Sequence, residues 1–513
     1  MHVALTNQDL IAVIVADLPK DTLAVLGQTC KAFSDIALNA LWRVMNSLDP
    51  LYLCLPADVC VRDADGELVR GKLTSEPSHW ERFDVNAARI KVLVYSSRSK
   101  IRQDLLLMLK LCRQQQSPPL PNLSELKVQC TCSEGELAIL LSTLMHCHLQ
   151  SLMVNSPYTN AVAAVLSAAQ LSSPSLQALS IRRTPNVLPL ASGFTQLRVL
   201  TYFVAKSVID SLSLTLLSRL THLHTLDITA KLTTTSFNPD TQSNTSITTC
   251  FPALERLSLH GVLDLQTLSR FLRLITSPGL QHITIIYQQS RVLQTDMSAL
   301  GKGLAAHTRL SSLNLSNLSS TSEKICVSDL STHLCHLQNL EMVKLHSVLS
   351  DVEISKHLAI PQLTSTWSKL RRLSIVCDSW ACAPELEFLL RHFASNCPLL
   401  EYLYIAASVS VSTNFAAMND LPPSPRISRT LKICLAPRGK HEFVFDKTAA
   451  FKVAVYISDI YPNIEIAPQS SLFTSVDTGT RAAWQEVSDW IHKLNAVRAA
   501  ERERTRREML LDS

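Results

Sequence analysis

Glycine and charge are both scarce in this chain of 513 residues. Only 11 residues are glycine, and Asp, Glu, Lys and Arg together make up 18% of the sequence. No GxGxxG or GxxxxGK[ST] pattern occurs, so a nucleotide-binding loop has no support in the sequence. The formal net charge is +5 and is dispersed along the chain. This argues against a nucleic-acid partner and against a basic surface that binds membranes.

Long apolar runs and paired cysteines are lacking as well. No run of about 18 or more apolar residues occurs, so no transmembrane helix is expected. The first apolar run, Leu10–Val15, follows an aspartate instead of a basic segment, so it does not have the pattern of a signal peptide. The 14 cysteines are scattered without a CxxC pair. This distribution favours a reducing setting, in the cytoplasm, the nucleus or both.

Two short clusters contain residue types that bind metals. His146–His148 and His333–His336 each combine two histidines with a cysteine. Both lie where a helix is expected to end just before a strand, so adjacent side chains there point apart, and no fourth ligand follows nearby. We therefore expect no metal site and no cofactor. No nucleophile, base and orienting group recur together, so the sequence predicts a chain that is not an enzyme.

The first 47 residues have the pattern of three short helices. The first helix is expected to start from a cap at Thr6 or Asn7 and to end before Pro19; the second starts at Asp21 and loosens at Gly27. Three helices of about ten residues each bury too little apolar surface to be comfortably stable alone. The first helix carries Leu10, Val13, Ile14 and Leu18 as one apolar stripe, and the second is expected to place Leu23, Leu26 and Cys30 inward. The third carries Phe33, Ala37, Leu41 and Trp42.

Several short sequences in this segment follow a known pattern. They are the pair Leu18–Pro19, the Cys-Lys-Ala-Phe sequence of Cys30–Phe33 and the closing pair Leu41–Trp42, with further similarity in Leu48–Val59 and His79–Leu93. Together they resemble an F-box of the form found at the start of fungal F-box proteins. The sequence departs from the pattern at positions 5 and 6, where Leu-Thr stands in place of the Leu-Pro of many F-boxes.

This resemblance implies a function for the first helices. It implies docking onto the Skp-type adaptor of a cullin–RING ubiquitin ligase, with the chain as substrate-recognition subunit of an SCF-type complex. The residues implied in the helix core and the adaptor contact, in proportions that the sequence does not separate, are Leu10, Ile14, Leu18, Pro19, Leu23, Leu26, Cys30, Phe33 and Trp42. The alternative is that the helices only cap the repeats that follow.

One phrase recurs from residue 93 onward: a leucine, two residues, a leucine or isoleucine, one residue and another aliphatic. The middle aliphatic falls at 93, 126, 152, 179, 200, 226, 257, 283, 313, 343, 373, 403, 431 and 464, and four consecutive steps from 283 to 403 are each 30 residues. This spacing is typical of leucine-rich repeats. Segments with helical spacing lie between the phrases, at Glu136–His146, Ala161–Leu171, Leu265–Ile275, Met297–His307 and Glu385–Ser395.

The sequence therefore predicts an α/β fold in which residues 93–466 form a horseshoe-shaped solenoid of leucine-rich repeats, after the F-box and a connecting segment at 48–92. The Asn or Cys position that such repeats carry after the strand is mostly missing. Two polar stretches, 232–249 and 419–428, are expected to be loops. Residues 467–513 form a tail whose amphipathic helix is expected to cap the solenoid with Trp484, Val487, Ile491, Leu494 and Val497.

The strand positions between the buried aliphatics are expected to face the concave side. They are Lys127, Asp227, Arg256, Ser258, Asn314, Lys344, Arg372, Tyr402 and Tyr404. Because Arg and aromatic residues dominate binding interfaces, we expect Arg372, Tyr402 and Tyr404 to contact a target protein, whose identity the sequence does not give. The alternative is an interaction scaffold that never joins a ligase. An enzyme or GTPase activator has no specific signature here.

Overall fold

The computed structural model describes residues 8–29, 31–62, 64, 68–71, 76–96, 103–113, 118–129, 133–158, 160–162, 164, 172–182, 200–209, 214, 217–230, 250–262, 264–287, 294–317, 328–346, 359–376, 386–406, 431–436, 451, 454–455, 457–458, 461, 464–466 and 478–511. The chain divides into two compact units. Unit 1 contains residues 1–230 and 251–254, and unit 2 contains residues 231–250 and 255–513.

Unit 1 begins with three helices, α1 (Gln8–Ala16), α2 (Lys20–Thr29) and α3 (Lys31–Arg43). Their core is formed by Ile11, Val15 and Leu23, against which further apolar side chains pack, namely Leu18, Leu26, Phe33, Ile36, Ala40 and Leu41. The sequence left open which residues of the α1 stripe are core, and in the structure Leu10, Val13 and Ile14 are exposed. Seven consecutive positions of α1 are apolar, so two stripes fit the helical period, and packing against α3 buries the one that contains Ile11 and Val15.

The second helix also differs from the expectation at its end. It does not loosen at Gly27 but runs on to Thr29. Gly27 faces α3, and a Cβ atom built on it would lie 3.6 Å from Cδ2 of Leu38, which is an ordinary van der Waals contact. The close packing of α2 on α3 therefore holds a helical turn that glycine alone would weaken.

The segment between the helices and the repeats is folded. Strand β1 (Val44–Met45) directly follows α3 and pairs in parallel with β4 (Val92–Ser96). Between them lie α4 (Asp49–Tyr52), the antiparallel pair β2 (Cys60–Arg62) and β3 (Leu68–Arg70), and α5 (Pro77–Ala87). The rings of Trp80 and Phe83 are buried edge to face, with centroids 5.3 Å apart. The first helices thus continue into the sheet through β1.

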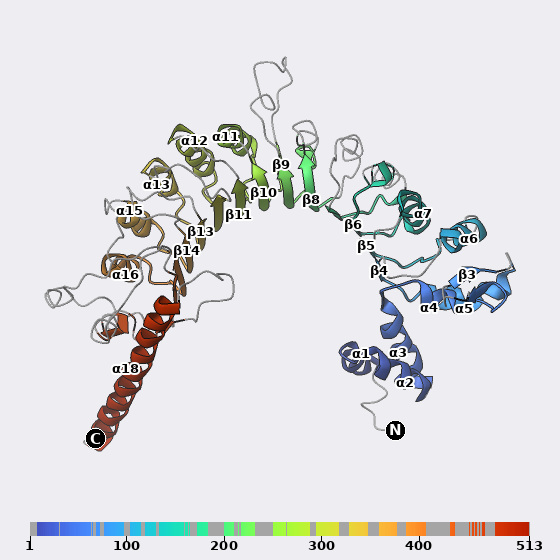
Figure 1. Ribbon diagram of the computed structural model, residues 1–513, viewed down its shortest axis with the longest axis horizontal. Coiled ribbons are helices and arrows are strands. Elements are labelled where there is room, and N and C mark those ends of the chain that lie inside the picture. Colours follow the sequence, from blue (N-terminus) through green and yellow to red (C-terminus); the bar gives the residue numbers. More distant parts are fainter. Residues whose placement is uncertain are drawn as a thin grey trace, which may run out of the picture. The chain divides into compact units, whose positions relative to one another are not determined.

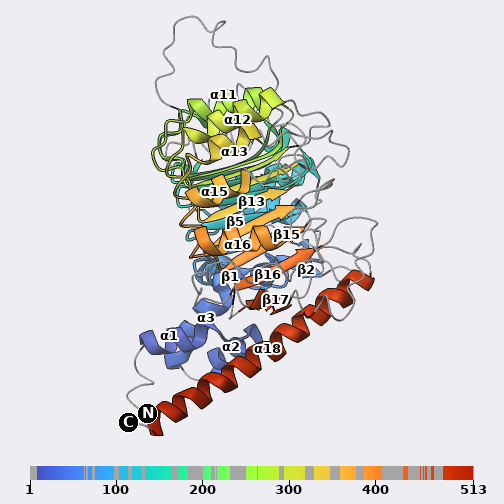
Figure 2. The ribbon, with the colours of Figure 1, turned by 90° about the vertical axis from the view of Figure 1, so that its left-hand side faces the viewer.

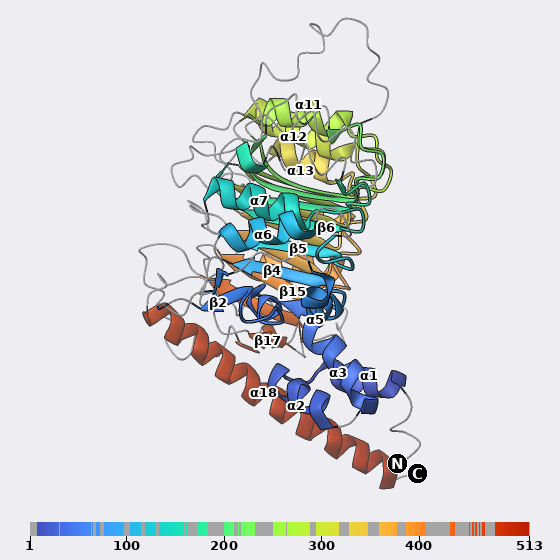
Figure 3. The same ribbon diagram turned by 90° about the vertical axis from the view of Figure 1, so that its right-hand side faces the viewer.

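The remaining strands of unit 1 are parallel and follow the chain order. They are β5 (Glu125–Gln129), β6 (Ser151–Asn155), β7 (Ala178–Arg182), β8 (Tyr202–Ile209) and β9 (Thr225–Ala230). Figure 3 shows α6 (Gln103–Arg113) and α7 (Glu134–Leu144) stacked on one side of these strands. One expected anchor is displaced, because Phe203 and not Leu200 pairs with Leu179 and Leu226. Leu200, three residues before Phe203, is buried as well.

Unit 2 repeats the same arrangement. Its parallel strands are β10 (Arg256–Val262), β11 (His282–Tyr287), β12 (Ser312–Asn317), β13 (Met342–His346), β14 (Arg372–Val376), β15 (Tyr402–Ala406), β16 (Leu431–Ala436) and β17 (Ile464–Ile466). The pairing places Ile433 and Ile466 in the anchor row, each two residues after the expected anchor. The step of 30 residues therefore extends to β16.

Five described helices of unit 2 lie on one side of its strands. Figures 1 and 2 show them following one another in chain order, as α11 (Leu265–Leu274), α12 (Gln294–Ala305), α13 (Ser328–Leu334), α15 (Ala359–Thr366) and α16 (Leu386–Asn396). The anchor side chains of β10 to β15 are buried, namely Leu257, Ile283, Leu313, Val343, Leu373 and Leu403. Each unit is thus an α/β stack of repeats, as in a solenoid.

In several repeats of unit 2, a buried donor that precedes the strand lies within hydrogen-bonding distance of the helix of the preceding repeat. His307 Nε2 lies 3.0 Å from the carbonyl oxygen of Leu272, and Trp367 Nε1 donates over 3.4 Å to that of Leu334. Cys397 Sγ lies 3.9 Å from the carbonyl oxygen of Thr364. Each donor stands six residues before the anchor of its strand and reaches the final turns of the preceding repeat's helix. These contacts satisfy carbonyls that a helix end leaves without intrahelical partners.

The chain closes with a long helix, α18 (Thr478–Leu511). Val487 and Ile491 are buried, and α18 contacts β17. Arg498 Nη1 donates to the carbonyl oxygen of Ser458 over 2.6 Å. Val497 is exposed, so the buried stripe ends earlier than expected.

None of the helices in the described ranges is both long and apolar enough to cross a membrane. The stretches 232–249 and 419–428 and most of 161–171 lie outside the described residues, as does the side chain of Trp484.

Candidate interaction surfaces

Helix α1 presents an apolar face to solvent. Leu10, Val13 and Ile14 are 50%, 70% and 62% exposed, and their spacing of three and four residues places them on one side of the helix. We call these three residues the apolar face of α1. On α2, Val25 is exposed as well. Exposed aliphatic side chains that gather on one face mark a contact site more often than scattered ones do.

The residues expected at an adaptor contact fall into two groups. Leu23 is buried, while Leu18, Leu26, Phe33 and Trp42 are half-buried. Pro19 is exposed, together with Leu10 and Ile14, and Cys30 lies outside the described residues. The sequence missed Val25. The sequence could have indicated it, because Val25 is an apolar residue two positions after the inward-facing Leu23, and this spacing places it on the opposite side of the helix.

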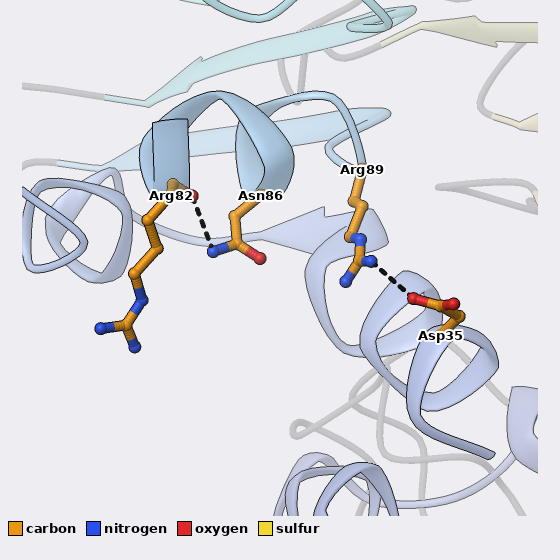
Figure 4. Close-up of polar contacts among 4 residues, drawn as sticks. All are labelled: Asp35, Arg82, Asn86 and Arg89. Atoms are coloured by element: carbon orange, nitrogen blue, oxygen red, sulfur yellow. Dashed lines mark hydrogen bonds and ion pairs between the residues drawn. The ribbon is translucent and has the colours of Figure 1, made fainter. Parts of the chain in front are cut away.

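The three helices are attached to the following segment by polar contacts as well as by β1. Arg89 Nη2, just after α5, donates to Oδ1 of Asp35 on α3 over 2.9 Å (Figure 4). Lys20 Nζ donates to the carbonyl oxygen of Val44 over 2.8 Å. These contacts hold α2 and α3 against the start of the sheet, so the apolar face of α1 has a defined position within unit 1.

A second surface lies on the strands of unit 2, opposite its helices. We call it the polar face, and it consists of the side chains that alternate with the buried anchors on β10 to β15. These are Arg256, Ser258, His260, His282, Thr284, Ile286, Ser312, Asn314, Ser316, Met342, Lys344, His346, Arg372, Ser374, Tyr402 and Tyr404. Arg256, Lys344 and Arg372 are exposed, and no Asp or Glu stands in this set.

Two of the three residues expected to bind a target lie side by side on this face. Arg372 on β14 is directly opposite Tyr402 on β15, and Tyr402 is half-buried. Tyr404 pairs with Ser374 and is only 8% exposed, so it offers little surface to a partner. The alternation of the strand alone does not reveal this burial.

Histidines on the polar face bond to hydroxyl groups. His260 Nε2 lies 2.9 Å from Ser258 Oγ, and His346 Nε2 lies 2.9 Å from Ser374 Oγ. Burial lowers the pKa of His282, and the nearby charge of Arg256 lowers it further, while Glu255 and Glu341 oppose this shift. His282 is therefore neutral at neutral pH and does not add to the positive charge of this face.

The histidine and cysteine clusters do not form a metal site among the described residues. The ring centroids of His146 and His148 are 6.0 Å apart. Burial lowers the pKa of His146. The backbone N–H of His148 donates to Nδ1 of His146, so that nitrogen is already engaged. In the described part of the chain, no three His, Cys, Asp or Glu side chains gather in a way that would hold an ion.

No protein-family profile matches the sequence, and no curated protein is similar to it. Among solved structures, the crystal structure of the Rad7 and Elc1 complex in yeast contains a chain that matches with a TM-score of 0.36 and 16% identity, over 72% of this chain and 88% of that chain. The Toll–Spatzle complex of Drosophila matches with a TM-score of 0.31 and 12% identity, over 77% of this chain and 59% of that one. Because both TM-scores are below 0.5, neither match supports an argument about function.

Proposed function

We propose that this protein is the substrate-recognition subunit of an SCF-type ubiquitin ligase. The apolar face of α1 docks on a Skp-type adaptor, the adaptor joins the chain to a cullin–RING ligase, and the repeats hold a target protein. The chain carries out no chemistry itself and acts in the cytoplasm, the nucleus or both. The observation that carries the proposal is the exposure of Leu10, Val13 and Ile14 on a three-helix unit whose sequence resembles an F-box.

The energetics of α1 support a docking role. Each exposed aliphatic side chain that a partner covers contributes about 1.5–3 kcal/mol when fully buried. The core of the three helices contains Ile11, Val15 and Leu23 as a buried cluster, and Ala37 of α3 is buried as well. The apolar face of α1 can therefore be covered by a partner without exposing this core.

The rival reading is a scaffold in which the helices only cap the repeats. The pairing of β1 with β4 favours it, because a cap also continues the sheet. The two readings differ in what happens at the apolar face of α1. A cap needs the buried side of α1, toward α3, whereas an adaptor needs the exposed side.

The test is co-purification of the full chain with a fungal Skp-type adaptor. The double variant Val13→Glu and Ile14→Glu places charge on the exposed side of α1, so we expect it to fold and to bind the adaptor at least about a hundredfold more weakly. Leu111→Glu is the matched control, because Leu111 on α6 is 64% exposed and lies outside the three helices. If the wild-type chain does not bind the adaptor, or the double variant binds as well as the control, the proposal is wrong.

A further inference from the structure

The polar face of unit 2 has an uneven distribution of charge. Arg256 on β10, Lys344 on β13 and Arg372 on β14 are exposed cations, and no carboxylate stands among the outward-facing positions of β10 to β15. Unit 1 differs in this respect. There Lys127 on β5 is paired with Glu125 of the same strand at 2.9 Å, and the exposed Arg182 on β7 is matched in number by Asp227 on β9. The excess of positive charge therefore belongs to the outward-facing strand positions of unit 2.

Carboxylates do occur near this face, but at one edge. Glu255 and Glu341 stand one residue before β10 and β13, and Glu401 stands one residue before β15. Glu401 is engaged with Arg371 at 3.3 Å. The acidic side chains thus border the edge where the strands begin, and Arg256 and Arg372 stand at the same edge as the first residues of β10 and β14. Lys344 lies two positions further along its strand, away from these carboxylates. An acidic segment would therefore be drawn to the part of the face that contains Lys344 and, one strand further, Arg372.

The spacing of the cations indicates the shape of the partner. Neighbouring strands lie about 4.8 Å apart, so β10 and β14 are separated by about 19 Å across the sheet. A single phosphate group could reach Lys344 and Arg372 on the neighbouring strands β13 and β14, but it cannot also reach Arg256 on β10. An extended peptide covers the same span with about six residues. Cations spread over this distance match separate carboxylates along a chain better than one concentrated charge.

The side chains between the cations suit a peptide. Thr284, Asn314 and Ser316 are short, half-buried and polar, and Ser316 Oγ already donates to Oδ1 of Asn314 over 3.2 Å. Hydroxyl and amide groups can exchange hydrogen bonds with a peptide backbone. Tyr402, next to Arg372, adds a half-buried ring of the kind that anchors interfaces.

We propose that the polar face of unit 2 binds an extended, Asp- or Glu-rich segment of a partner protein, with Arg256, Lys344 and Arg372 contacting separate carboxylates. This surface is the target-binding part of the function proposed above and rests on it for its biological role. Binding of an acidic peptide and binding of an adaptor are nevertheless separate measurements on different units.

The experiment is fluorescence anisotropy of the full chain with a labelled decapeptide of alternating Asp and Ser. A Lys–Ser decapeptide, a phosphoserine peptide of equal net charge and a single-stranded oligonucleotide serve as comparison probes. We expect the Asp–Ser peptide to bind most tightly and its affinity to fall with salt. Lys344→Glu with Arg372→Glu should weaken it by about tenfold or more, since each reversal removes an attraction and adds a repulsion.

The matched control reverses two charges on the helix side of the same unit. Arg273 on α11 and Lys302 on α12 are exposed there, so Arg273→Glu with Lys302→Glu should leave binding of the peptide within about twofold. The inference is overturned if the control weakens binding as much as the face variant, or if the Asp–Ser peptide binds no better than the Lys–Ser peptide. Tighter binding of the phosphopeptide or of the oligonucleotide also overturns it. The adaptor assay is run on the same samples. If the wild-type chain binds the adaptor but not the Asp–Ser peptide, this inference fails while the proposed function stands.

Discussion

Asp35 and Arg89 are joined across 54 positions of the chain by a hydrogen bond of 2.9 Å between Oδ1 and Nη2. The side chain of Arg89 is only 16% exposed, whereas that of Asp35 is 80% exposed. The pair connects α3 to the residues that follow α5, and so it fixes the three helices against the beginning of the sheet (Figure 4). Its energetic contribution is limited, because one partner remains in water.

For this pair we predict a small, salt-dependent effect on stability. A double-mutant cycle of Asp35→Ala and Arg89→Ala should give a coupling free energy below about 1 kcal/mol, which decreases at high salt. Urea unfolding in low and high salt measures it. Arg89→Ala alone should cost more than Asp35→Ala alone, since the half-buried stem of Arg89 also loses packing. A coupling well above this limit would show that the pair is shielded from solvent.

Buried His307 should make stability depend on pH. Burial lowers its pKa below the ordinary 6.5, so the folded state binds fewer protons than the unfolded state. This contribution to stability is complete above pH 6.5 and is lost as the pH falls below 6.5 toward the folded-state pKa. The free energy of unfolding, measured by urea titration between about pH 8 and 5, should therefore decrease toward acid.

The control for His307 is His307→Gln, which keeps a side-chain donor near the carbonyl of Leu272 but does not titrate in this range. The variant should show a shallower loss of stability toward acid than the wild type. His146 shifts in the same direction, so some dependence on pH should remain. An unchanged slope in His307→Gln would contradict the assignment.

Two glycines in helices should respond in opposite ways to alanine. A Cβ atom on Gly301 in α12 would lie 2.8 Å from Cβ of His333 in α13, so the helices must move apart. We expect Gly301→Ala to lower the free energy of unfolding by about 1–3 kcal/mol. Gly27→Ala meets only an ordinary contact at Leu38 and should be neutral or stabilising by up to about 1 kcal/mol. Denaturant unfolding measures the free energy of unfolding of both variants, and equal changes in the two would contradict this prediction.

Within the three helices, burial ranks the leucines. Leu23 is buried and Leu26 is half-buried, so Leu23→Ala should destabilise this part by about 2–5 kcal/mol and Leu26→Ala by less. Amide hydrogen exchange of α2 and α3 measures the local effect. The reverse order would mean that the packing of α2 differs from the one described.

Much of the repeat architecture follows from the sequence. The strands at 313, 343, 373 and 403 lie at the expected anchors, and α7, α11, α12 and α16 begin within three residues of the expected starts. Buried aliphatics at a constant step leave few alternatives, because each strand and helix must bury its apolar side against its neighbour. The strand near Leu200 was displaced, since Leu and Phe three residues apart both fit the pattern and only pairing with β7 and β9 selects Phe203.

The candidate surfaces were less predictable. The sequence pattern does not distinguish whether Leu10 and Ile14 belong to the core of the three helices or to a contact with a partner, because α1 is apolar around most of its circumference. It also gave Tyr404 the same standing as Arg372, although only Arg372 is exposed. Exposure depends on what packs over a strand position in the folded chain, and strand alternation does not contain that information.

The sequence by itself determined the repeating strand and helix, since a step of 30 residues between buried aliphatics is a local property that each repeat carries. The tertiary structure decided which side of α1 faces α3 and which carbonyl each buried donor reaches. It also decided that Asp35 meets Arg89. These are relations between segments far apart in the chain, and they are fixed by packing, which no single segment specifies.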